Sequence, residues 1–463
     1  MHKWSPLVAV SLGTFMLVLD INIVVVALPT IGAELDASTV ELQWIVDLYA
    51  LVIAALLLAA GGLADRCGHR GLYLAGSILF GLASLACALA PTPTALVAAR
   101  GVQALGSIAM LATSAALISL TYDGRERATA FGVWAGAASL GSALGPIIGG
   151  VLTELLGWRW IFAVNVPVVA VIVLVTVLAV PSIAGRTTGR FDLIGVAAFG
   201  TAAAGIVHGL NHSVEDGWAA PLTWTPLIIG ALALTGFVAH ELRTDHPAFD
   251  VRLLKEPAFT ALLVAGTALN AAAFGMLPFA SVWMQSVLLA GPLHAGIMLM
   301  PLAVASLVTS LTLPRIAHRL GPRPMIGGGL LLIAVGAALA GLVQTGSSGW
   351  ALTPALTLVG LGTGAVLPSL TGTTLASAPA DRAGMAGAAL NTARSLGYAV
   401  GFAVFAVVVT AHVPGGIGAA SPASAGDVVA GLHAGFNVAA GIAAAGALTI
   451  AIGLRPARRP VTA

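Results

Sequence analysis

Long apolar segments alternate with short polar loops along the whole chain. A helix needs about 17–25 apolar residues to cross the hydrocarbon core of a bilayer. The pattern therefore predicts an all-α membrane protein with 14 transmembrane helices. We expect these helices at residues 8–31, 41–62, 71–90, 95–121, 127–154, 161–181, 193–211, 222–240, 258–280, 292–314, 324–345, 350–372, 384–411 and 430–453.

The composition agrees with a membrane location. Of the 463 residues, 58% are hydrophobic and 8% are charged, and the mean hydropathy is +1.00, whereas soluble proteins contain about 25% charged residues. No basic stretch with interleaved aromatic residues is present, so no nucleic acid is expected as a partner. The first apolar segment, from Leu7 to Ile31, is longer than the ~7–15-residue core of a signal peptide, so we expect it to be retained as the first helix. Cys67 and Cys87 lie at opposite ends of one predicted helix, ~30 Å apart, and predict neither a disulfide nor a metal site.

The basic residues sort to one side of the predicted topology. Of the 20 Lys and Arg residues, 17 fall in the loops and tails on the side that carries both termini. The opposite loops carry mainly acidic residues, with Arg159 as their basic residue. Because cytoplasmic loops are enriched in Lys and Arg, we expect both termini in the cytoplasm.

A weak internal repeat divides the chain. Residues 64–70 read A-D-R-C-G-H-R and residues 317–323 read A-H-R-L-G-P-R, which share the skeleton A-x-R-x-G-x-R. Parallel repeats are typical of secondary transporters, whose substrate sites lie near the bilayer midplane between the halves. We therefore expect a six-helix bundle in residues 1–185, two inserted transmembrane helices in residues 186–250, and a second six-helix bundle in residues 251–463.

Asp20 lies near the centre of the first predicted helix. A charged side chain at that depth costs about 2.5–3.5 kcal/mol on insertion scales, and a carboxyl group avoids this cost when it binds a proton. Proton uptake on one side of the membrane and release on the other would couple transport to a proton gradient. The alternative is a structural hydrogen bond between helices.

Arg100 and Asp47 are the other candidates for proton coupling. Arg100 lies in the outer half of the fourth predicted helix, where an ion pair with Asp20 or Asp47 would make both charges tolerable. Alternatively, its long side chain reaches the outer interface. Asp47 lies two turns into the second predicted helix and is either a second proton or cation site or a hydrated residue of the outer vestibule.

Glycines recur at every fourth position in the segment GSALGPIIGG, residues 141–150. Such a stripe lies on one face of a helix and lets two helix backbones pack closely in lipid. The proline inside the segment removes a helical hydrogen bond and kinks the helix. A pivot or seal between two moving halves would use these properties, and the alternative is plain tight packing. The predicted pivot consists of Gly141, Gly145, Pro146, Gly149 and Gly150.

The loop GGLADRCGHR, residues 61–70, is short, rich in turn-forming residues and mixed in charge. Its aspartate can cap a helix or pair with a basic residue at a neighbouring helix end. A contact that holds the cytoplasmic ends together in one state and breaks in the other would act as a gate. The alternative is that the arginines only fix the topology. The predicted cytoplasmic gate consists of Gly61, Asp65, Arg66, Gly68 and Arg70.

Aromatic and amide side chains in the predicted inner helices are candidates for a substrate cavity, because such a cavity for lipophilic ligands uses adaptable apolar and a few polar groups. The alternative for most of them is packing or contact with lipid. We expect Asn391 and Arg394 to be structural first and to contact substrate second. The candidates are Asn22, Trp44, Gln103, Trp134, Trp283, Gln285, Asn391 and Arg394.

The sequence contains no phosphate-binding loop, dinucleotide-binding glycine set, zinc-protease motif or serine-hydrolase motif. It therefore predicts a protein that is not an enzyme, that uses no cofactor or metal, and that draws its energy from a gradient.

Five segments resemble the major facilitator superfamily, in its fourteen-helix drug–proton antiporter branch. One of them is the segment 158–162 with Asn165 and Pro167. Residues 61–70 resemble G-x-L-A-D-R-x-G-R-K, and residues 141–150 match G-x-x-x-G-P-x-x-G-G. Residues 96–106 resemble the family's fourth-helix arginine motif. Residues 19–29 resemble L-D-x-T-I-V-N-V-A-L-P, with Asn22 and Val25 in place of the threonine and asparagine.

This resemblance implies a major facilitator fold, and it implies export of lipophilic drugs, antibiotics or cationic dyes in exchange for protons by alternating access. It places the chain in a bacterial plasma (inner) membrane, with protons, a small substrate and the bilayer as its partners, and we expect a monomer. Two alternatives stay open: a uniporter, importer or exporter of an endogenous metabolite, and a transporter-like sensor that does not transport.

Overall fold

The computed structural model describes residues 3–37, 39–180, 192–215, 217–244, 249–313, 320–378, 383–413 and 424–454. Every regular element in these ranges is a helix. The side chains of three predicted site residues, Asp47, Asp65 and Pro146, lie outside the described part.

The first bundle is built mainly from long helices, and α4 (Pro93–Thr121) shows how such a helix begins, with a capping side chain and a proline in its first turn. At the start of the fourth helix, the Thr92 hydroxyl accepts a hydrogen bond from the Ala95 N–H at 3.2 Å, and Pro93 occupies the first turn. A proline there sacrifices no helical hydrogen bond. The helices are α1 (Ser5–Leu35), α2 (Thr39–Cys67), α3 (His69–Ala88), α4 (Pro93–Thr121), α5 (Gly124–Leu156), α6 (Arg159–Ala163) and α7 (Asn165–Ala179).

Two helices of this bundle depart from straight rods. The segments Gly124–Ser142 and Ile147–Leu156 of α5 meet at 48°, around Pro146, which has no N–H to donate to the preceding turn. The predicted helix at 161–181 is two helices, α6 and α7, because Pro167 cannot donate to the carbonyl four residues earlier.

The second bundle follows a short 3₁₀ turn and contains a break near the middle of its first span. The predicted helix at 258–280 ends earlier, at Ala273, and the chain then continues as α11 and a π-helical turn to Val287. Pro278 in the first turn of α11 explains the restart. The elements are η1 (Val251–Lys255), α10 (Pro257–Ala273), α11 (Leu277–Val282), η2 (Trp283–Val287), α12 (Pro292–Thr312), α14 (Pro322–Ala340), η3 (Gly349–Leu352), α15 (Thr353–Ala376), α16 (Ala383–Thr410) and α17 (Ala425–Gly453).

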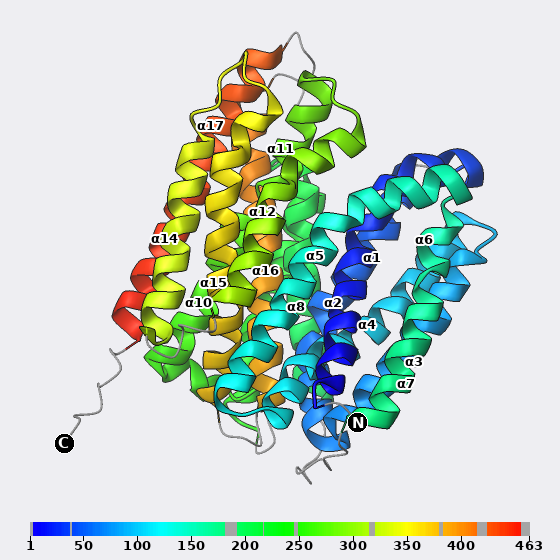
Figure 1. The fold of residues 1–463 in the computed structure, drawn as a ribbon, viewed down its shortest axis with the longest axis vertical. Coiled ribbons are helices and arrows are strands. Elements are labelled where there is room, and N and C mark those ends of the chain that lie inside the picture. The colour runs from blue at the N-terminus through cyan, green and yellow to red at the C-terminus, as the bar shows by residue number, and fades with distance from the viewer. Residues whose placement is uncertain are drawn as a thin grey trace.

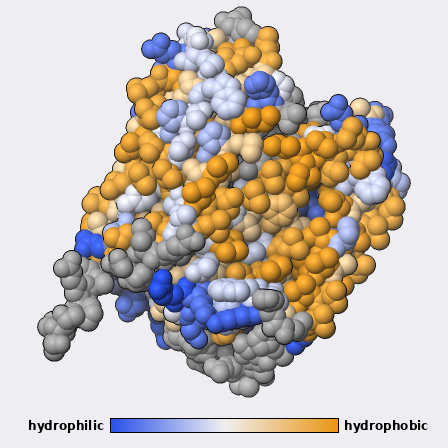
Figure 2. Space-filling view, in the orientation of Figure 1, coloured by the Kyte–Doolittle hydropathy of each residue, from blue (hydrophilic) through white to orange (hydrophobic). Residues whose placement is uncertain are grey.

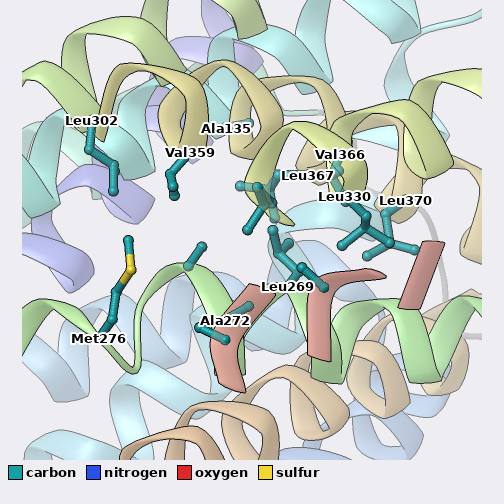
Figure 3. Close-up of a cluster of buried hydrophobic side chains, with 14 of the residues drawn as sticks. Ala135, Leu269, Ala272, Met276, Leu302, Leu330, Val359, Val366, Leu367 and Leu370 are labelled. Carbon is teal, nitrogen blue, oxygen red and sulfur yellow. The ribbon is translucent and has the colours of Figure 1, made fainter. Parts of the chain in front are cut away.

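Apolar side chains from several helices of the second bundle meet in one core. Leu269 and Ala272 of α10 lie opposite Leu367 and Leu370 of α15 (Figure 3). Since lipid is as apolar as these side chains, close packing rather than hydrophobicity alone stabilises such helix contacts.

Two further helices, α8 (Leu193–Glu215) and α9 (Pro221–Glu241), lie between the bundles in sequence. Gly205 of α8 faces Gly230 of α9, and a Cβ at Gly205 would come within 2.9 Å of the Gly230 backbone. Helix α8 also contacts α2 and α16, where Phe199 packs near Leu51 and Leu396. The pair therefore lies against a helix from each bundle.

Twelve helices in the described ranges are long and apolar enough to cross a membrane, or 13 when the bent α5 is counted as one span. The space-filling view shows hydrophobic residues over the middle of the molecule and hydrophilic residues toward its ends (Figure 2). The protein is therefore an all-helical, multi-pass membrane protein, and the expectation of 14 spans stays a prediction.

The two bundles meet through α5, which packs against α1 on one side and against α12 and α15 on the other. Figure 1 shows the helices close together at the lower end, where α1 begins and α17 ends, and diverging toward the upper end. The Ser139 hydroxyl of α5 and the Ser306 hydroxyl of α12 are hydrogen-bonded at 2.8 Å. This bond directly joins the first bundle to the second.

Candidate functional site

The carboxylate of Asp20 lies at the centre of a buried polar network, with 0% of the residue exposed. Its Oδ2 accepts a hydrogen bond from Arg100 Nη1 at 2.6 Å. Its Oδ1 accepts hydrogen bonds from Gln103 Nε2 at 3.0 Å and from Asn165 Nδ2 at 2.8 Å. Three donors from α4 and α7 therefore surround an acid on α1.

Arg100 is as buried as its partner, with 1% of the residue exposed. Its Nε donates to the Ile45 carbonyl at 3.2 Å, and its Nη1 also donates to Gln103 Oε1 at 2.6 Å. The guanidinium carbon lies 4.0 Å from the centre of the Tyr49 ring, a cation–π arrangement. The side chain thus pairs with Asp20, as the first of the two proposed partners, and it does not reach toward the outer interface.

Two serines extend the network to neighbouring helices. Gln103 Nε2 donates to Ser84 Oγ of α3 at 2.8 Å, and Asn165 Nδ2 donates to the same oxygen at 3.3 Å. The Ser107 hydroxyl donates to the Gln103 carbonyl at 3.1 Å and is hydrogen-bonded to the Tyr49 hydroxyl of α2 at 2.7 Å. Side chains from α1, α2, α3, α4 and α7 thus converge on one ion pair.

From the sequence, Gln103 is expected in a substrate cavity, and neither Ser84 nor Asn165 is expected in a site. Ser84 is a small polar residue in an apolar segment, which is too common a signal to select it. Asn165 lies in a segment that resembles the antiporter branch, but that resemblance assigns it no role. Their assignment needs the positions of α3 and α7 relative to α1.

This arrangement ties the protonation of Asp20 to the packing of five helices. In a low dielectric the ion pair is tolerable because both charges are compensated and hydrogen-bonded. If a proton neutralised Asp20, Arg100 would be left as an uncompensated buried charge, and breaking a buried pair costs about 3–5 kcal/mol. A change of protonation would therefore favour a rearrangement of these helices.

The glycine stripe of α5 lies directly against the stretch of α1 that carries Asp20. A Cβ added at any of three glycines would collide with α1, so these positions hold the two backbones in close contact. Such a Cβ would lie 2.6 Å from the Phe15 carbonyl oxygen at Gly141, 2.5 Å from the Asn22 Cβ at Gly145, and 2.9 Å from the Ile23 Cγ1 at Gly149.

The other face of α5 points to the second bundle. A Cβ at Gly136 would lie 2.8 Å from Leu307 Cδ1 of α12. Gly150, which the sequence analysis grouped with the pivot, has no such neighbour within 4 Å. The stripe therefore contacts α1 with three of the four predicted glycines.

In the segment predicted as a cytoplasmic gate, the side chain of Arg70 contacts another helix of the same bundle. Gly68 adopts a φ of 89°, which favours glycine, and separates α2 from α3. Arg70 Nη2 donates to the Val177 carbonyl of α7 at 2.8 Å. The remaining candidates lie near the end of α2: Gly61 is buried, Arg66 is half-buried, and the side chain of Asp65 is outside the described part.

Several residues predicted for the substrate cavity are packed inside the bundles. Trp134, Trp283 and Gln103 are each buried. Trp134 Nε1 donates to Thr14 Oγ1 at 2.7 Å. Protein atoms therefore cover these three side chains almost completely in this conformation.

The other predicted cavity residues are more accessible and lie on different helices. Asn22 Nδ2 donates to the Val18 carbonyl at 2.7 Å. Trp44 is 37% exposed and its ring centre lies 5.9 Å from that of His208 on α8. In the second bundle, Gln285 Nε2 donates to Ser281 at 2.8 Å, and Asn391 and Arg394 are neighbours on α16.

Within the described ranges, no group of three or more His, Cys, Asp or Glu side chains could hold a metal ion.

Comparisons with known proteins agree with this architecture. The model of the family described as Major Facilitator Superfamily matches residues 10–402. The multidrug resistance protein Stp of Mycobacterium tuberculosis is 34% identical over 406 residues, which cover 88% of this chain and 75% of Stp. The methylenomycin A resistance protein of Streptomyces coelicolor is 33% identical over 86% of this chain and 84% of its own length. The multidrug efflux pump LfrA of Mycolicibacterium smegmatis is 31% identical over 94% of this chain and 87% of its own length.

Among solved structures, the human organic anion transporter MFSD10 (TETRAN) has the same fold. Its TM-score is 0.69 at 16% sequence identity, and the match covers 97% of this chain and 100% of the other.

Proposed function

Because the chain belongs to the Major Facilitator Superfamily, we propose that it exports small lipophilic drugs or antibiotics from the cytoplasm in exchange for protons. Relatives named as multidrug or antibiotic resistance proteins and as an efflux pump align with most of the chain, which supports drug export. The buried ion pair of Asp20 and Arg100 carries the proposal of proton coupling.

In the proposed cycle, Asp20 carries the proton and Arg100 adjusts its affinity. A proton that arrives from the outer side neutralises Asp20, and Arg100 loses its counter-charge. The rearrangement that follows moves α1 against α4 and α5, with the Gly145 contact as the pivot. Once the site faces the cytoplasm, Asp20 releases its proton as the cargo binds, and the ion pair forms again.

We also propose that the chain crosses the membrane 14 times, with α2 and the bent α5 as spans in addition to the twelve candidate spans. The 29 residues of α2 give it the length to cross. Helices α8 and α9 are then an insert between two six-helix bundles, and the protein acts as a monomer in a bacterial plasma membrane. Both termini lie in the cytoplasm, as the basic loops favour.

The test is ethidium transport and proton flux in proteoliposomes that contain the full chain. Wild-type protein and the control Asp36→Asn are expected to move ethidium when a pH gradient is imposed, and to move protons when ethidium is added. Asp36 is an exposed acid at the end of α1 in a left-handed conformation, which asparagine tolerates. Asp20→Asn is expected to lose the component that depends on the pH gradient.

Three other outcomes contradict the proposal in different ways. Unchanged pH-driven transport by Asp20→Asn would remove this residue from the coupling. Ethidium movement that follows only its own gradient would indicate a uniporter. No movement of any probe, together with full tolerance of substitutions at Asp20 and Arg100, would indicate a protein that does not transport.

A further inference from the structure

A second arginine lies inside the membrane region, and its hydrogen-bond partners among the described residues are neutral amides. Arg394 is in α16, within the apolar span Met385–Val409, and its side chain is half-buried. Its Nε donates to Asn270 Oδ1 at 3.4 Å and its Nη1 donates to Asn391 Oδ1 at 3.3 Å. Among the residues that the structure describes, no carboxylate lies within ion-pair distance of this guanidinium.

The surroundings of Arg394 differ from those of Arg100 in charge and in bond length. Arg100 donates to a carboxylate at 2.6 Å, whereas both acceptors of Arg394 are neutral amides at long hydrogen-bond distances. A guanidinium has five N–H donors, and a charged side chain in a membrane span is costly and marks a substrate or ion pathway by default. Arg394 therefore has free donor capacity and a positive charge that no carboxylate of the described residues compensates.

Arg394 belongs to a helix that lies where the two bundles approach each other. Helix α16 packs against α10 of its own bundle and against α2 and α4 of the other. Gly266 of α10 provides the room, since a Cβ at that position would lie 3.2 Å from Arg394 Cγ. Substrate sites of transporters built from two repeats lie in this region between the halves.

We infer that Arg394, together with Asn270 and Asn391, recognises an anionic group of the cargo, such as a carboxylate or a sulfonate. Planar guanidinium donors match such groups, and charge-assisted hydrogen bonds to them are about twice as strong as neutral ones. This inference rests on the proposed export function and adds amphipathic anions to its cargo. The amide oxygens of Asn270 and Asn391 hold the guanidinium in place while the site is free of cargo.

An anionic cargo changes the electrical balance of the cycle. If one monoanion leaves the cell for each proton that enters, two charges cross the membrane per cycle. Exchange of one monocation for one proton moves no net charge. An inside-negative potential by itself should therefore drive export of the anion and leave one-for-one export of the cation unchanged.

Proteoliposomes with the full chain test this with two fluorescent probes, the anion 8-anilinonaphthalene-1-sulfonate and the cation ethidium. Wild-type protein is expected to move the anion, faster with a potassium diffusion potential of the appropriate sign. Arg394→Gln should lower anion transport about 10-fold or more, as expected from loss of a charge-assisted hydrogen bond, and should leave ethidium transport within about twofold. Arg394→Lys, which keeps the charge, should retain part of the anion transport.

Arg159→Gln is the matched control, because the Arg159 side chain is 40% exposed and pairs with Glu34 at the very start of its candidate span. It should leave transport of both probes unchanged. Equal loss of both probes in Arg394→Gln and Arg394→Lys would indicate a structural role and overturn the inference. pH-driven transport of ethidium without any transport of the anion by wild-type protein would overturn it as well and leave the proposed export function standing. If neither probe moves, the export function fails and this inference fails with it.

Discussion

Gly145 of α5 lies against Asn22 of α1, two residues along the chain from Asp20. A Cβ at Gly145 would come within 2.5 Å of the Asn22 Cβ, so the two helices can keep their present distance only because residue 145 has no side chain. The position of Asp20 relative to Arg100 thus depends on the backbone of α5.

Gly145→Ala should therefore push α1 away from α5 and reduce pH-driven transport. Inserting a methyl group into such a contact costs about 1–3 kcal/mol, so the thermal unfolding midpoint in detergent should fall. Gly150→Ala is the control, because nothing lies within 4 Å of its Cβ position. If both variants transport at the wild-type rate, the stripe is not a pivot.

The ion pair predicts an energetic coupling between Asp20 and Arg100. Arg100→Gln should lower stability by about 3–5 kcal/mol, because it leaves a buried carboxylate without its counter-charge. The double variant Asp20→Asn with Arg100→Gln should be more stable than Arg100→Gln alone, since neither charge is then unpaired. Thermal unfolding of the four proteins gives the coupling energy, and additive effects of the two changes would contradict the ion pair.

Ser139 and Ser306 are close enough for an engineered disulfide, which should lock the two bundles in this conformation. With Oγ atoms 2.8 Å apart, sulfur atoms at the two positions start within about 1 Å of the S–S bond length of about 2 Å. In a background that lacks the free Cys67 and Cys87, oxidation of Ser139→Cys with Ser306→Cys should abolish transport, and reduction should restore it.

Each single cysteine variant serves as its control and should transport under both conditions. Full cross-linking with undiminished transport would show that α5 and α12 do not separate during the cycle.

Tyr122 lies at the C-terminal end of α4, outside the spans. Its phenol group should make the folding stability of the protein fall at alkaline pH. Burial raises the pKa of Tyr122 above its ordinary value of 10.0, helped by the nearby charge of Glu126 and opposed by the hydrogen bond from the Leu7 N–H. Because the folded protein binds the phenolic proton more tightly than the unfolded chain, this stabilisation is complete below pH 10 and is lost as the pH rises above it.

Tyr122→Phe has no such titration but loses the bonds with Leu7 and with the Lys3 carbonyl. It should be about 1 kcal/mol less stable at pH 8, and the difference from wild type should shrink above pH 10. Unfolding midpoints measured from pH 8 to pH 11 check this, and a constant difference would contradict it.

The location of the candidate site could be predicted because the free-energy cost of a charge in an apolar span depends on that single position. Asp20 and Arg100 stand out in the sequence, since any charge inside an apolar span needs a partner. The proposed contact between them is present in the structure. The glycine stripe was also visible, because a four-residue spacing fixes one helix face regardless of what packs on it.

The composition of the site could not be predicted to the same degree. Gln103 lies in the ion-pair network and not in an open cavity, and Asn165 and Ser84 belong to that network as well. Trp283 was expected near substrate and is buried in the second bundle. Polar and aromatic side chains of this kind can satisfy either role, and the neighbouring helices decide between them.

The sequence by itself determined that this chain is a membrane protein of many helices. It also determined which positions carry charges within the apolar segments, and which helix has a face made of glycines. These follow from the free energy of placing each residue type in hydrocarbon, which is a property of single positions and their neighbours along the chain. Only the tertiary structure decided that Asp20 pairs with Arg100, 80 residues away, and with Asn165, 145 residues away, and that Arg394 faces amides rather than an acid. Those partnerships depend on how whole helices pack, because side chains so distant in sequence meet only where close backbone contacts bring their helices together.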